Sequence, residues 1–169
     1  MTTPHATYLP PSDNRLFRQV RNDERYIRDG VVTSYAFRPM PKDQGELSVD
    51  VEPLTTADKC YADFIANGGH SVGVWAVTTQ ECAATGLNAY HKPRISPPPN
   101  PSHGVVDFKD LTDKESRKKG AKLAEFATIR KRVYPEGDVQ AQPPAAPPAA
   151  GAMPPPQTES SRRSDESST

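Results

Sequence analysis

The stretch SVGVWAV, from Ser71 to Val77, is the most apolar run in the chain and predicts the central strand of a sheet. Side chains on a strand alternate between its two faces, so Trp75 shares a face with Gly73 and Val77. We therefore expect Trp75 to be a core residue and not an exposed recognition aromatic.

Further strand patterns lie before this run. The segments 16–20 (LFRQV) and 47–51 (LSVDV) alternate apolar and polar side chains, and 31–37 (VVTSYAF) is rich in β-branched and aromatic residues. Asp29-Gly30, in the long loop between the first segment and 31–37, is a strong turn signal. These patterns predict three short strands before the central one.

A helix is expected between 47–51 and the central strand. Thr55 fits its N-cap, and the helix pattern stops at Gly68-Gly69. Its apolar face should carry Tyr61, Phe64 and Ile65. This helix and its two flanking strands predict one right-handed β-α-β unit.

The sequence after the central strand predicts two more helices. A capping pattern at 78–81 opens a short helix that ends at Gly86, and a proline-rich loop precedes a strand at 105–108. The clearest capping box, 112–115, begins the longest helix, which runs to about Arg132. The residues expected on the buried face of this helix are Gly120, Leu123, Phe126, Ala127, Ile129 and Val133.

Together these elements predict a single α+β domain over 15–135, with a mixed sheet of about five strands, two to three helices and a long C-terminal helix. Residues 1–14 contain three prolines and no apolar period, which favours a flexible arm. Residues 136–169 are rich in proline, alanine and serine and contain no aromatic residue. Such a composition buries too little apolar surface to offset the entropy of ordering, so this tail is expected to be disordered.

Charge and composition narrow the functional classes. The chain has equal numbers of acidic and basic residues, but 15–135 holds 19 Lys and Arg against 15 Asp and Glu. This mild excess permits anionic partners and is far below the charge of a dedicated nucleic-acid binder. Cys60 and Cys82 show no disulfide or CxxC pattern, and no apolar run is long enough to span a membrane. We expect a cytoplasmic protein with reduced cysteines.

Several segments resemble a group of short uncharacterised bacterial proteins. The likeness rests on LFRQV, on the G-x-x-x-S-x-x-F-R-P pattern of 30–39, on PKD at 41–43, and on LSV, SVGVWAVTTQEC and VVDF. It covers roughly 16–135 and implies a compact bacterial domain without assigning an activity. The histidine-proline pair that often follows LFRQV in that group is replaced here by Arg21-Asn22. Chemistry that needs an imidazole at this place would be absent.

Four residues are candidates for an anion site: Arg18, Ser34, Arg38 and Lys42. In outline, Arg18 and Ser34 resemble the arginine and serine with which ADP-ribosyltransferases hold a dinucleotide. The scheme also needs a glutamate, and the nearest candidate, Glu81, lies in a predicted helix without an E-x-E motif. The alternative is that Arg18 is a solvated residue on an edge strand and Ser34 a strand hydroxyl.

The last helix carries candidates for nucleic-acid contact: Arg117, Lys118, Lys122 and Arg130. Their charges spread around the helix and do not form one stripe, so a solvated helix face is the alternative. The four histidines lack the short spacing of local metal sites, so neither a metal nor a cofactor is expected.

The leading hypothesis is a small intracellular binding or accessory protein without catalytic activity. Its partner would be another protein or a small anionic ligand. One alternative is a small enzyme acting on a nucleotide-like substrate, held by Arg18, Ser34 and Arg38. A second alternative is a weak nucleic-acid binder that uses the last helix.

Overall fold

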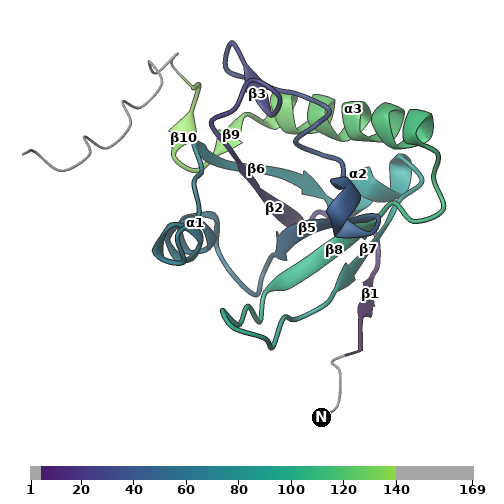
Figure 1. The fold of residues 1–169 in the computed structure, drawn as a ribbon, viewed down its shortest axis with the longest axis horizontal. Helices are drawn as coiled ribbons and strands as arrows, with labels where there is room; N and C mark the ends of the chain where they lie inside the picture. Colours follow the sequence, from purple (N-terminus) through teal and green to yellow (C-terminus); the bar gives the residue numbers. More distant parts are fainter. Residues whose placement is uncertain (1–4, 140–169) are drawn as a thin grey trace, which may run out of the picture.

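The computed structural model describes residues 5–139, which fold around a six-stranded sheet (Figure 1). The strand order is β1 (Thr7–Leu9), β7 (Asn88–His91), β8 (His103–Asp107), β5 (Glu46–Val51), β2 (Arg15–Val20) and β6 (Gly73–Thr78). Two short ribbons pair β3 (Ile27–Arg28) with β4 (Val31–Val32) and β9 (Arg132–Val133) with β10 (Glu136–Gly137). The helices are α1 (Ala57–Ala66), α2 (Thr79–Ala84), α3 (Asp113–Arg130) and the 3-10 turn η1 (Pro41–Asp43). The α+β class is confirmed.

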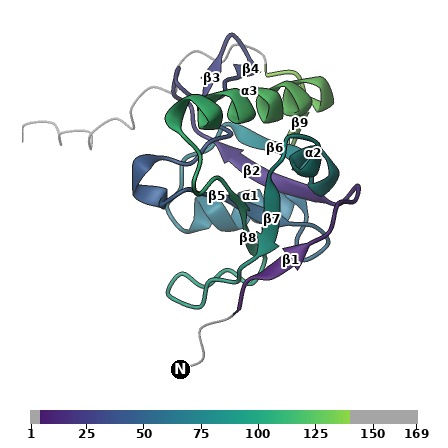
Figure 2. The same ribbon diagram turned by 90° about the vertical axis from the view of Figure 1, so that its right-hand side faces the viewer.

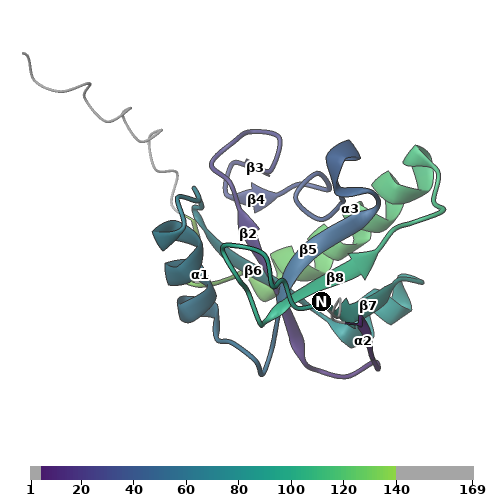
Figure 3. The same ribbon diagram turned by 60° about the horizontal axis from the view of Figure 1, so that its bottom comes forward.

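Helices lie on both faces of the sheet (Figures 2 and 3). On β2, Leu16 and Val20 join the main core with Leu123 of α3, while Phe17 faces the other way and packs with Cys60 of α1. This period-two alternation divides the apolar side chains between two layers. The main core therefore lies under α3, and a smaller cluster lies under α1.

The predicted central strand is β6, and all six of its residues are buried. Trp75 is 2% exposed, which confirms it as a core residue. Although β6 ends the strand order, its outer edge is covered: Val74 exchanges backbone hydrogen bonds with Tyr134, and Arg130 donates to the carbonyl of Ala76 at 2.8 Å. These contacts satisfy backbone groups that an open edge would expose.

The β-α-β unit differs from the prediction because a third strand intervenes. β5 and β6 flank α1 in sequence, but β2 lies between them in the sheet and pairs antiparallel with both. Each hydrogen-bonded pair in the six-stranded sheet is antiparallel, so the sheet is antiparallel where the sequence predicted a mixed one, and β5 and β6 run in the same direction because both pair with β2.

The predicted strand at 31–37 is wrong beyond Val32. Successive backbone turns join Ala36 to Thr33 and Phe37 to Ser34. The apolar character of this segment comes from burial, since Phe37 is fully buried in the main core. Asp29 and Gly30, both at positive φ, close the short β3–β4 hairpin instead of a long hairpin from β2.

The terminal boundaries also need correction. The expected flexible arm contains β1, which extends the sheet through β7, a strand that the sequence analysis missed. At the other end, β10 and Val139 belong to the ordered domain, and Val139 packs against the main core. The rest of the predicted disordered tail, 140–169, lies outside the described residues.

The two capping boxes form as predicted at Thr78–Glu81 and Thr112–Glu115. α1 begins one residue later than expected, with Thr56 as its N-cap. The prediction that Ile129 faces the core is wrong, because its side chain is 74% exposed. Ala124 is buried on α3 instead, so the buried face is narrower than the sequence suggested.

Candidate functional site

A groove crosses the α1 face of the sheet, which we call the sheet groove. It consists of two adjoining hollows of about 320 and 350 Å³ that share Asp50, Phe64, Arg94 and Asn100. The first, the cationic lobe, lies over β2 and β5 and reaches η1. The second, the polar lobe, lies between α1 and the segment 99–102. α1 covers only the β6 and β2 end of this face, which leaves polar residues of β5 uncovered.

The cationic lobe takes its name from four basic side chains, Arg18, Arg21, Lys42 and Arg94. Within residues 5–139, none of the four forms an ion pair. Its two carboxylates are already hydrogen-bonded: Asp43 accepts from the Met40 amide at 2.8 Å, and Asp50 accepts from Asn100 at 2.8 Å. The lobe therefore has an excess of positive charge.

Arg18 lies where β2 and β5 separate. The two strands pair only at Leu16–Val51 and Phe17–Asp50. Beyond that point, the half-buried Arg18 guanidinium donates to the carbonyls of Ser48 and Ala36, each at 2.9 Å. Burial lowers the pKa of Arg18, whose ordinary value is so high that the group stays charged. Two of its five donors are used here, so others remain for a ligand.

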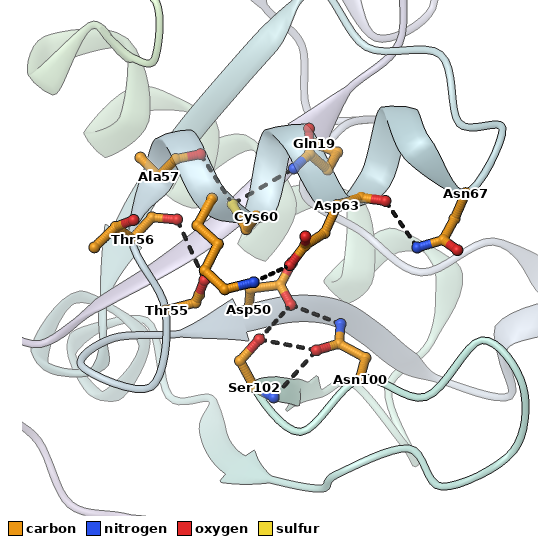
Figure 4. Close-up of polar contacts among 11 residues, drawn as sticks. Gln19, Asp50, Thr55, Thr56, Ala57, Cys60, Asp63, Asn67, Asn100 and Ser102 are labelled. Atoms are coloured by element: carbon orange, nitrogen blue, oxygen red, sulfur yellow. Dashed lines mark hydrogen bonds and ion pairs between the residues drawn. The ribbon is translucent and has the colours of Figure 1, made fainter.

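The proline-rich loop brings Arg94 and Asn100 to the groove. Their backbones hydrogen-bond to each other in both directions, at 3.0 and 2.8 Å, and close the loop around the intervening prolines. Asn100 donates to Oδ1 of Asp50 at 2.8 Å (Figure 4). The Ser102 hydroxyl, which has one proton, lies 3.1 Å from the same oxygen and 2.8 Å from Oδ1 of Asn100. This network fixes the Asp50 carboxylate between α1 and the loop.

Cys60 lines the polar lobe but is a poor nucleophile. Its thiol donates to the carbonyl of Ala57 at 3.3 Å, and the Gln19 amide nitrogen lies 3.5 Å from its sulfur (Figure 4). Burial raises the pKa of Cys60 to about 12, so the thiol stays protonated at neutral pH. Gln19 also keeps one buried oxygen, Oε1, without a hydrogen-bond partner among residues 5–139.

The structure brings two of the four predicted anion-site residues together. Arg18 and Lys42 both line the cationic lobe, whereas Ser34 and Arg38 do not. Ser34 lies in the turn beside α3, where its carbonyl would be 2.9 Å from a side chain at Gly120. Arg38 stacks on Tyr35 and pairs with Asp113 at the start of α3. The expectation that Arg18 is solvated on an edge strand is wrong, because β2 lies inside the sheet.

Most of the nucleic-acid candidates on α3 are held by other groups. Arg117 pairs with Asp113, Lys122 with Glu125, and Arg130 with Glu81. Lys118 is exposed and has no ion-pair partner within 5–139. Three of the four candidate cations on α3 are therefore engaged in ion pairs, and they do not form one basic surface for nucleic acid.

Glu81, the carboxylate considered for an ADP-ribosyltransferase scheme, is also engaged. It accepts from the Thr78 amide at 2.8 Å and pairs with Arg130 at 2.7 Å, and it does not line the groove. Residues 5–139 hold no group of three or more His, Cys, Asp or Glu side chains that could bind a metal ion. In the same part of the chain, no helix combines the length and the apolar character needed to cross a membrane.

Comparison with family models, with curated proteins and with solved structures gave no match. The site therefore has to be interpreted from its own geometry. Sequence reasoning missed Arg21, Asp50, Arg94 and Asn100. The sequence marks Arg94 and Asn100 only by their position on either side of the triple proline. They come close to β2 and β5 only in the folded structure.

Proposed function

We propose that the protein is a small binding or accessory protein that holds an anionic small molecule in the cationic lobe. The observation that carries this proposal is the set of four basic side chains in one hollow that lack ion pairs within 5–139, while both neighbouring carboxylates are hydrogen-bonded. Like charges gathered in a concave, partly desolvated site repel one another, and an anion relieves that repulsion.

The chemistry of these side chains suits a phosphate or carboxylate. Arg21 and Arg94 can each present a planar pair of donors, and Lys42 adds a point charge. Arg18 is fixed by two backbone carbonyls, so its guanidinium is already oriented before a ligand arrives. Such preorganisation reduces the entropy cost of binding.

The two alternatives have less support. An enzyme built on Arg18, Ser34 and Arg38 would need all three side chains in one hollow, whereas Ser34 and Arg38 do not line the cationic lobe and Arg38 pairs with Asp113. A nucleic-acid surface on α3 would need cations that are engaged in local ion pairs. The cytoplasmic location expected from the sequence remains a prediction.

Thermal-shift titration with inorganic phosphate, sulfate, citrate, sugar phosphates and nucleotides tests the proposal. At least one of these anions should raise the unfolding temperature, and the rise should shrink as salt screens the charges. Arg21→Ala and Lys42→Ala should abolish most of the shift with little effect on the fold, since neither side chain holds another group among the described residues. Lys118→Ala, which removes an exposed charge outside the groove, is the matched control and should respond as the wild type does. If no anion stabilises the protein, or if all three variants respond equally, the proposal is wrong.

A further inference from the structure

The polar lobe adjoins the cationic lobe. Asp50, Phe64, Arg94 and Asn100 line both hollows, so a ligand in the cationic lobe can contact Asp50 and Asn100 where the two lobes meet. The groups in the polar lobe differ in kind from the basic cluster. Apart from Arg94, which both lobes share, they are acceptors or uncharged hydrogen-bonding groups around the Lys59–Asp63 ion pair: Asp50, Thr55, Asn67, Asn100 and Ser102.

Asp50 is the acceptor at the junction of the two lobes. Its contacts with Asn100 and Ser102 are both made by Oδ1, and no donor within residues 5–139 reaches Oδ2. An ionised carboxylate can accept about four hydrogen bonds. Oδ2 therefore has free capacity for a donor on a ligand, and its negative charge disfavours a second anionic group at that place.

From this arrangement we propose that the sheet groove binds a hydroxylated anion, such as a sugar or polyol carrying one phosphate or carboxylate. Its acidic group lies in the cationic lobe, and a hydroxyl group donates to Asp50. The inference rests on the proposed function, which concerns the acidic group, and adds the hydroxylated part of the ligand. Hydroxyl groups supply the donor that the carboxylate lacks, and they suit the surrounding amide and hydroxyl side chains.

The decisive comparison uses two probes that differ only in hydroxyl groups, glycerol 3-phosphate and propyl phosphate. In calorimetric titrations, the wild type should bind glycerol 3-phosphate about fivefold or more tightly than propyl phosphate, the gain expected from a hydrogen bond to a charged acceptor. Glycerate, the carboxylate analogue, and inorganic phosphate complete the series and show which acidic group the cationic lobe prefers.

Asp50→Asn converts the free acceptor into a donor and keeps an oxygen for Asn100 and Ser102. In this variant the preference for glycerol 3-phosphate should fall to less than about twofold. Propyl phosphate should bind at least as tightly as before, because a negative charge has been removed. Asp113→Asn, which makes the same change on α3 outside the groove, should keep the preference.

The outcomes separate this inference from the proposed function. Equal affinity of the wild type for both probes, or a preference that survives in Asp50→Asn, overturns the hydroxyl assignment while phosphate binding itself stands. If neither probe nor inorganic phosphate binds, the proposed function fails as well. Should Asp50→Asn fail to fold, amide shifts of the wild type decide: glycerol 3-phosphate must perturb Asp50 and Ser102 more than propyl phosphate does, and equal shifts contradict the inference.

Discussion

Replacing Arg130 with alanine should lower the free energy of unfolding by about 2 kcal/mol. The Arg130 guanidinium donates to the Ala76 carbonyl at 2.8 Å and to both oxygens of Glu81, at 3.0 and 2.7 Å. Without Arg130, the Ala76 carbonyl on the outer edge of β6 loses this donor and the Glu81 carboxylate loses its ion-pair partner. The side chains of Arg130 and Glu81 are 27% and 18% exposed, so solvent can only partly replace these bonds.

The magnitude follows from this intermediate burial. Fully exposed ion pairs contribute at most about 1 kcal/mol, whereas removing one partner of a buried pair costs about 3 to 5 kcal/mol. Glu81 keeps its hydrogen bond from the Thr78 amide, which limits the penalty. Arg130→Lys should recover only part of the loss, because a lysine cannot reproduce the paired geometry.

Urea denaturation followed by the fluorescence of the buried Trp75 measures the effect. Lys118→Ala on the same helix is the control and should stay within about 0.5 kcal/mol of the wild type. A double-mutant cycle with Glu81→Gln should return a coupling of about 1 kcal/mol between the two side chains. If Arg130→Ala is as stable as the control, Arg130 does not stabilise the outer edge of β6. Arg130 would then again be a candidate for contact with nucleic acid.

Three further results are expected. Trp75→Ala should cost about 3 to 5 kcal/mol because the side chain is 2% exposed, and the native protein should show blue-shifted tryptophan emission; red-shifted emission would place the indole in water. Iodoacetamide at pH 8 should leave Cys60 and Cys82 unmodified until the protein unfolds, because burial raises the pKa of each thiol to about 12. Rapid labelling of the folded protein would contradict this. Removal of residues 140–169 should leave the denaturation midpoint unchanged, whereas truncation before Tyr134 should lower the midpoint through loss of the contacts with Val74. Equal midpoints for the two truncations would show that the C-terminal ribbon contributes nothing to stability.

Local patterns were enough to place the elements whose formation depends on nearby residues. The capping boxes at Thr78 and Thr112 are short-range hydrogen-bond arrangements, so their sequence signature and their structure coincide. The apolar run of β6 predicted a buried strand because a strand covered on both faces needs apolar side chains throughout. The same approach failed at 34–37, where burial under α3 produces an apolar pattern without a strand.

Strand order and the site are decided by contacts between distant segments. β2 enters between β5 and β6, although its sequence alternation is compatible with an edge or an inner position. The four cations of the cationic lobe come from three separate segments of the chain, and no ion pair within residues 5–139 marks their role. Composition and periodicity thus determined the fold class and most helices, because these depend on neighbours along the chain. Only the tertiary structure decided which charges meet, because side chains far apart in sequence share a groove only after the sheet has assembled.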